Sequence, residues 1–186
     1  TKLMQANSLN NYLTDGLVGF WSLDGPDVSW SQNKAFDRSG QGKDGTITNM
    51  STTTSPVPGI IGQALFFDGA TSDYIDIGDQ AIYSFTSGGG TDLPFSIAAW
   101  VRMDDATTFR TFGKVGILTG TYEWGLFTSA SDTLCMNIYD SGDDQIGRCS
   151  TAITAYEGHW YHMAGTYDAT KAASGIKLYM NGVQVD

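Results

Sequence analysis

The stretch Phe95-Ser-Ile-Ala-Ala-Trp-Val-Arg-Met103 decides the fold class. Every second residue from Phe95 to Met103 is apolar, whereas Ser96 and Arg102 point to the opposite side, and this period of two predicts a half-buried β-strand. The stretch Ile176-Lys-Leu-Tyr-Met-Asn-Gly-Val-Gln-Val185 repeats the alternation on both sides of Asn181-Gly182. Asn-Gly supplies the two positive φ angles of a type I′ turn, so a β-hairpin is expected here.

The remaining apolar runs are also short, and each ends at Gly, Asp or Pro. Many short strands with frequent turn signals predict an all-β, antiparallel β-sandwich. We expect this domain to span residues 16–186, preceded by a polar, Asn-rich leader or linker over residues 1–15. The other predicted strands are Leu17–Leu23, Ala64–Phe67, Tyr74–Ile77, Tyr122–Phe127, Leu134–Tyr139 and Trp160–Tyr167.

The composition agrees with a turn-rich β-protein and excludes two classes of function. Of the 20 acidic residues, 18 are Asp, which favours turns and caps, and the chain has 23 Gly. The net charge of −10 leaves no basic surface for nucleic acid or for an anionic membrane. No apolar run approaches the ~20 residues that cross a bilayer, so membrane insertion is not expected.

The two cysteines are predicted to face each other across a hairpin. Centring the loop 140–144 on Gly142 pairs Tyr139 with Gln145, and the same register pairs Cys135 with Cys149. Cβ atoms of directly opposed residues approach ~4.5–5.5 Å, so a disulfide and an oxidising compartment are predicted. The alternative is two reduced thiols, or a register shifted by one residue.

Six ordered motifs make the chain resemble a known family from about Leu17 to its last residue. The motifs are Gly19-Phe-Trp-Ser-Leu-Asp24, Asp37-Arg-Ser-Gly-Gln-Gly-Lys-Asp-Gly45, Gly62-Gln-Ala-Leu-Phe-Phe-Asp-Gly69 with Asp73-Tyr-Ile-Asp76, Phe95-Ser-Ile-Ala-Ala-Trp-Val101, Gly158-His-Trp-Tyr-His-Met-Ala164 with Thr166-Tyr-Asp168, and Leu178-Tyr-Met-Asn-Gly182. Their order and spacing resemble the laminin-G-like and pentraxin-like jelly rolls of concanavalin A type. The resemblance implies a two-sheet domain of a secreted or surface protein, usually non-catalytic and often carbohydrate-binding. The pentraxin disulfide has no counterpart, because neither of the two strands that would carry it contains Cys.

A catalytic role is not expected. Glucanases with this fold place two Glu in one strand as Glu-x-Asp-x-x-Glu, whereas Glu123 and Glu157 are the only Glu here and lie 34 positions apart. A glycosidase needs two carboxyl groups that flank the scissile bond within roughly 5–10 Å. We therefore expect a non-enzymatic module.

A structural calcium ion is the most specific cofactor prediction. The family often holds calcium between the end of the first strand and the following Gly-rich loop, which implies Asp24, Asp37 and a carbonyl near Gly42 as ligands. Calcium takes six to eight oxygen ligands, and flexible loops supply them readily. The alternative is a capped turn in which the Asp37 carboxylate binds the backbone of Ser39 or Gly40.

The ligand and the host protein are less defined. Exposed aromatic rings would serve as sugar-stacking platforms, and Trp30, Tyr83, Trp124 and Tyr156 are candidates in or near loops, although such residues are commonly buried. The favoured function is an extracellular or cell-surface binding or adhesion module for glycan or protein. The alternatives are a carbohydrate-binding module detached from a glycoside hydrolase and a structural subunit of a surface assembly.

The sequence ends four residues after Gly182, without the further strands that the resemblance implies. Missing strands would leave backbone groups unpaired along Leu17–Leu23 or a neighbouring strand, and such edges accept strands from another chain. We therefore expect either a fragment of a longer product or a second chain that completes the sheet.

Overall fold

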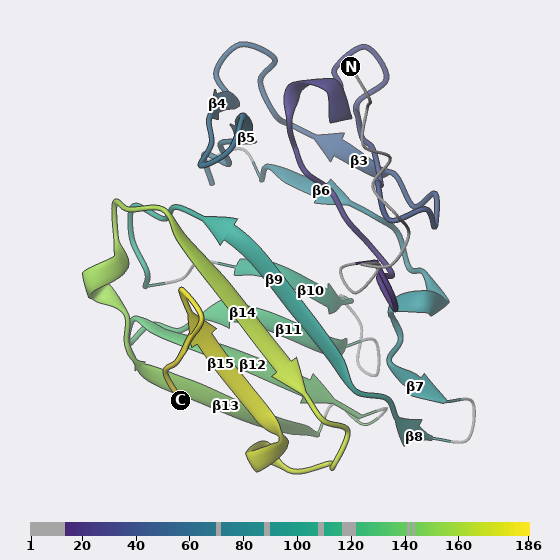
Figure 1. Cartoon of the computed structure of the whole chain (residues 1–186), viewed down its shortest axis with the longest axis vertical. Helices are drawn as coiled ribbons and strands as arrows, with labels where there is room; N and C mark the ends of the chain where they lie inside the picture. The colour runs from purple at the N-terminus through teal and green to yellow at the C-terminus, as the bar shows by residue number, and fades with distance from the viewer. Residues whose placement is uncertain are drawn as a thin grey trace, which may run out of the picture. The chain divides into compact units, whose positions relative to one another are not determined.

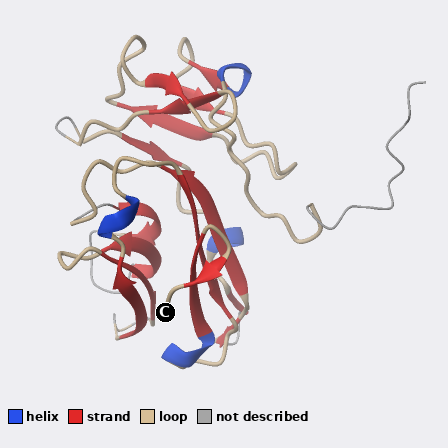
Figure 2. Ribbon diagram, turned by 60° about the vertical axis from the view of Figure 1, so that its left-hand side comes forward, coloured by secondary structure: helices blue, strands red, loops and turns tan. Residues whose placement is uncertain are grey.

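The computed structural model describes residues 14–69, 72–87, 90–107, 110–116, 122–140, 142 and 144–186. The chain divides into two compact units, residues 1–80 and 81–186, and its sheets are antiparallel (Figures 1 and 2). The predicted all-β class is therefore confirmed. Short turns of 3-10 helix connect some strands: η2 (Gly25–Asp27), η3 (Ala81–Tyr83), η4 (Thr154–Tyr156) and η5 (Ala173–Gly175).

The N-terminal unit contains one four-stranded sheet and one hairpin. The sheet has the order β1-β2-β3-β6, and β4 pairs with β5. Its small core lies around Ala35 and Ile47, with Trp21 and Trp30 packed against it. The strands are β1 (Val28–Ser29), β2 (Lys34–Ala35), β3 (Gly45–Thr48), β4 (Pro56–Pro58), β5 (Gln63–Leu65) and β6 (Tyr74–Asp76).

The C-terminal unit is a two-sheet sandwich with a short additional hairpin, β7–β8. One sheet has the order β10-β11-β12-β13 and the other β16-β15-β14-β9. In Figure 1 β14 and β15 lie in front of β11 and β12. The strands are β7 (Thr86–Ser87), β8 (Thr91–Asp92), β9 (Phe95–Val101), β10 (Arg110–Val115), β11 (Tyr122–Thr128), β12 (Thr133–Tyr139), β13 (Gln145–Ala152), β14 (Tyr161–Tyr167), β15 (Ile176–Met180) and β16 (Val183–Gln184).

The core of this unit fills the space between its two sheets. Leu126 and Met136 from one sheet and Met163 and Leu178 from the other are fully buried in one cluster. A Cβ atom added to Gly165 would lie 2.8 Å from the Met136 sulfur, so Met136 would have to shift to admit a side chain at this position of β14. Removal of this apolar surface from water is the main force that holds the sheets together.

Two predictions from strand alternation and turn chemistry are confirmed by the structure. The predicted apolar face from Phe95 to Val101 is the inner face of β9. The Asn181-Gly182 hairpin joins β15 to β16, and both turn residues have positive φ, +50° and +78°, as a type I′ turn requires.

The predicted register of the β12–β13 hairpin is also confirmed. Tyr139 pairs with Gln145 and Cys135 with Cys149, and the two cysteines form a disulfide. The turn length and the alternation together set this register, because a slip of one residue would have turned the buried Met136 to the outer face.

The predicted strand Leu17–Leu23 is wrong, because these residues form no strand. The Phe20 carbonyl accepts a bond from Arg38 N at 2.7 Å, but the Phe20 amide donates to the Asp37 side chain at 3.1 Å instead of to a backbone carbonyl. A carboxylate thus occupies the position of a ladder acceptor, and the regular pairing stops. Most of the predicted leader lies outside the described residues, so the domain boundary stays a prediction.

Candidate functional site

A cavity of about 710 Å³ lies at one end of the C-terminal sandwich and is partly open to solvent. We call it the end cleft. Antiparallel strands bring the starts of β9, β11 and β13 and the ends of β12 and β14 together there. The lining residues are Ser84, Phe85, Gly90, Asp92, Phe95, Tyr122, Glu123, Trp124, Ile138, Tyr139, Asp140, Asp144, Gln145, Ile146, Tyr167 and Lys171.

A packed group of aromatic rings forms the inner wall of the end cleft. Phe85 stacks on Phe95 with ring centroids 4.0 Å apart, and Trp124 and Tyr167 lie 5.7 and 5.9 Å from Phe95. The Trp124 indole N–H donates to the Tyr83 carbonyl at 2.8 Å. These contacts fix the rings in place, and the buried Trp124 forms part of the wall instead of an open stacking platform.

A second pair of rings belongs to the outer part of the cleft. Tyr122 at the start of β11 and Tyr139 at the end of β12 lie with centroids 5.4 Å apart and planes tilted by 46°. Asn137 Nδ2 donates to Tyr139 Oη at 3.2 Å and to Gln145 Oε1 at 2.7 Å. Asn137 therefore orients the tyrosine and the glutamine side by side at the same strand ends.

Two lysines neutralise two of the carboxylates of the cleft. Lys171 Nζ donates to the Gly90 carbonyl at 2.8 Å and lies 3.8 Å from Asp92 Oδ1. Lys114 Nζ lies 2.6 Å from Glu123 Oε1, and Ser84 Oγ also donates to Glu123 at 3.1 Å. Both lysines are thereby engaged within the protein.

Tyr167 is tied to the same polar group. Its hydroxyl donates to Asp92 Oδ2 at 2.5 Å and accepts from the Lys171 backbone amide at 3.1 Å. Burial, and after it the hydrogen bond to Asp92, raise the pKa of Tyr167 from 10.0 to about 12. The tyrosine is therefore a neutral hydrogen-bond donor at physiological pH.

The four aromatic residues predicted as candidates for sugar stacking lie in different parts of the structure. Trp124 lines the end cleft and Tyr83 supports it through its carbonyl. Trp30 packs against the core of the N-terminal unit, and Tyr156 stacks edge-on against the buried Tyr161. No sequence motif contains Tyr139 or Tyr122, and their one local signal is a position at a strand end beside a loop. All four assignments stay predictions.

The predicted calcium ligand Asp37 is already bonded within the protein. Its Oδ1 accepts from Phe20 N and Ser39 N at 3.1 and 2.8 Å, and its Oδ2 accepts from Ser39 Oγ and Lys43 N at 2.8 and 3.0 Å. Burial opposes ionisation, but these hydrogen bonds outweigh it and hold the pKa of Asp37 below its usual value. This is the capped turn expected as the alternative, and a cation would have to displace its donors.

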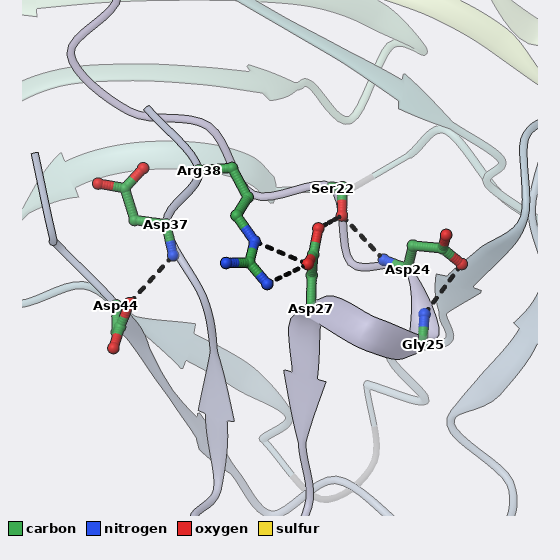
Figure 3. A network of polar contacts seen from close by, with 7 residues as sticks. All are labelled: Ser22, Asp24, Gly25, Asp27, Asp37, Arg38 and Asp44. Atoms are coloured by element: carbon green, nitrogen blue, oxygen red, sulfur yellow. Dashed lines mark hydrogen bonds and ion pairs between the residues drawn. The ribbon is translucent and has the colours of Figure 1, made fainter. Parts of the chain in front are cut away.

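Asp24 lies apart from Asp37. Asp24 Oδ1 caps η2 by accepting from Gly25 N and also accepts from Gln63 N, both at 2.9 Å. Figure 3 shows the Asp27–Arg38 pair lying between Asp24 and Asp37, whose carboxylates point away from each other. Gly42 is exposed with φ of +66°. Calcium at Asp24, Asp37 and Gly42 stays a prediction.

A different acidic cluster in the C-terminal unit could bind a metal. One carboxylate oxygen each of Asp105, Asp132 and Glu157 lie within 4.8 Å of one another. Hydrogen bonds already hold the three: the Thr107 amide donates to Asp105 at 2.7 Å, the Thr107 hydroxyl to Asp132 at 3.2 Å, and the Ala106 amide to Glu157 at 2.8 Å. No sequence motif predicts this cluster, because Asp105, Asp132 and Glu157 lie in three separate loops.

Comparison with known proteins places the chain in a family. The sequence model described as the concanavalin A-like lectin/glucanases superfamily matches residues 68–186, which is more than half of the chain. The chain belongs to this superfamily. The predicted family is thereby confirmed over residues 68–186, which include the whole C-terminal sandwich.

One solved structure is also similar to this chain. It is the crystal structure of an S-layer domain-containing protein (residues 221–444) from Clostridium thermocellum, with 25% sequence identity and a TM-score of 0.56. The match covers 90% of this chain and 70% of that one. No curated protein matches the chain.

Proposed function

We propose that this chain is a non-catalytic binding module of an extracellular or cell-surface protein, and that it binds glycan in the end cleft. The observation that carries the proposal is the combination of aromatic walls with polar groups in one partly open cavity. Sugar rings present apolar C–H faces and hydroxyl edges. A cavity of aromatic side chains with a few oriented polar groups suits such ligands.

Two observations support the surface location. Disulfides persist mainly in oxidising compartments, and the chain contains one between Cys135 and Cys149. The similar solved structure is described as that of an S-layer domain-containing protein. In the described part of the chain, no helix has the length and apolar character of a membrane span.

The state of the carboxylates supports a binding role over hydrolysis. A glycosidase needs one protonated carboxylic acid beside a second carboxylate. Within the end cleft Glu123 forms an ion pair with Lys114, and Asp92 accepts a hydrogen bond from the Tyr167 hydroxyl and lies near Lys171. Side chains of the protein itself therefore already contact both carboxylates.

A glycan array with the purified chain, followed by calorimetry on any ligand found, tests the proposal. Tyr122→Ala and Tyr139→Ala should each weaken binding about tenfold or more, because each removes a ring of the outer pair. Tyr179→Ala is the matched control, since Tyr179 belongs to the same unit but does not line the cleft. Binding that survives both cleft variants, or no glycan binding at all, would overturn the assignment.

Calcium is proposed as a structural ion of this module. The ion could bind at either of two places. One is the capped turn at Asp37, and the other is the cluster of Asp105, Asp132 and Glu157, whose carboxylate oxygens lie close together. Calorimetry with calcium alone would separate them. If Asp132→Asn loses calcium binding and Asp37→Asn keeps it, the ion binds at the cluster; if Asp37→Asn alone loses it, the ion binds at the turn. If the wild type shows no heat of calcium binding, calcium is not part of this module.

A second candidate function is that of a structural subunit in a surface assembly. The similarity to the S-layer domain-containing protein favours it. Such a subunit would recognise protein, including copies of itself, instead of glycan. Sedimentation velocity over a hundredfold range of concentration should then reveal self-association, and a single monomeric species throughout would argue against this candidate.

A further inference from the structure

The charges of the end cleft indicate which glycans it would accept, an inference that rests on the proposed function. Among the described lining residues are four carboxylates, Asp92, Glu123, Asp140 and Asp144, and one ammonium group, Lys171. No arginine or histidine occurs among those residues. The cavity therefore carries net negative charge, as does the whole chain at −10.

The two cations near the cleft already make contacts within the protein. Lys171 holds the Gly90 carbonyl at 2.8 Å and lies beside Asp92, and only 14% of the Lys114 side chain is exposed, where it contacts Glu123. Recognition of a sulfate or carboxylate needs charge-assisted donors that are free to turn toward it. In the described lining Lys171 is the single side chain of that kind; its side chain is 60% exposed, and four carboxylates outnumber it.

Neutral donors are available instead. Tyr139 Oη accepts from Asn137, so its own proton can go to a ligand. Gln145 Oε1 also accepts from Asn137, which leaves the Gln145 amide N–H groups as donors. Both residues line the cleft beside the Tyr122 ring, where a sugar C–H face could pack while its hydroxyl groups accept these bonds.

We infer that the end cleft is specific for uncharged sugars and excludes glycans that bear sulfate or carboxylate groups. An anionic group would meet the carboxylates of Asp140 and Asp144, and Asp140 Oδ1 accepts from the backbone amides of Gly142 at 2.8 Å and Asp144 at 3.0 Å. A repulsion of this kind weakens binding by about tenfold per ligand charge at low salt, and salt screens it.

Matched pairs of oligosaccharides test the inference: N-acetyllactosamine with its sialylated form, and lactose with its 3′-sulfated form. The neutral partner of a pair that binds should bind at least about tenfold more tightly at 20 mM salt, with a smaller ratio at 500 mM. The double variant Asp140→Asn/Asp144→Asn keeps the turn acceptor at position 140 and should raise only the affinity for the charged partner. Asp104→Asn, an exposed site outside the lining, is the control and should change neither.

The outcomes separate the inference from the function on which it rests. Equal binding of neutral and charged partners, or a double variant that leaves their ratio unchanged, would overturn the charge selectivity while glycan binding stands. Binding of no oligosaccharide at all would overturn the glycan function together with the inference.

Discussion

Removing the Cys135–Cys149 disulfide should destabilise the C-terminal unit by an amount that its loop length sets. The bond closes a loop across a sequence separation of 14 residues, and it staples β12 to β13. In the chain-entropy description, a cross-link over such a loop restricts the unfolded chain by about 3 kcal/mol at 25 °C. The double variant Cys135→Ser/Cys149→Ser should lose about that much free energy of unfolding.

Urea unfolding followed by tryptophan fluorescence measures this loss, because Trp124 and Trp160 lie in the unit that contains the disulfide. The wild type reduced with dithiothreitol serves as the control and should lose a similar amount, since the native contacts of its side chains are kept. A loss below about 1 kcal/mol, or reduced wild type as stable as the oxidised form, would refute the loop-entropy argument. A large loss in the serine variant alone would instead point to packing around the buried Cys135.

Three further predictions follow from the packing and the polar contacts. Met136→Ala should cost about 2–5 kcal/mol in urea unfolding, because Met136 is fully buried between the sheets, and a cost under 1 kcal/mol would contradict that position. Asp37→Ala should destabilise the N-terminal unit by about 2 kcal/mol in the same assay, with Asp37→Asn milder, since the carboxylate accepts four hydrogen bonds. Because the pKa of Tyr167 is raised from 10.0 to about 12, the unfolded chain loses this proton first, so stability should fall as pH rises from 10 to 12. Tyr167→Phe should show a shallower fall in thermal unfolding over that range, and an unchanged slope would contradict the assignment.

The sequence alone predicted the elements whose signal is local. The alternation from Phe95 to Val101 and the Asn181-Gly182 turn depend on neighbouring residues, and both appear as predicted. The Cys135–Cys149 pair could be predicted too, because a short loop transmits the register from one strand to the next. The family followed from six motifs in order, and the matched region confirms it.

Other elements had no such signal. Strand β10 reads Arg-Thr-Phe-Gly-Lys-Val, without an apolar alternation, and it pairs with β11 through two register shifts. Its place at the sheet edge depends on the partner strand and not on its own pattern. The run Leu17–Leu23 shows the converse, since its apolar pattern suits a strand but the Asp37 side chain takes the Phe20 amide.

The class of the fold, one hairpin register, the disulfide and the family could therefore be predicted from the amino-acid pattern. The position of the end cleft could not be predicted in this way, because the folded chain brings together Asp92, Tyr139 and Tyr167 from strands far apart in the sequence. Tyr139 resembles any other tyrosine in the sequence, and Asp37 has the residue type of a calcium ligand, yet it accepts hydrogen bonds from four protein donors. Strand period and turn type are properties of neighbouring residues, whereas a cavity and the free or occupied state of a carboxylate depend on which distant groups the folded chain brings within bonding distance.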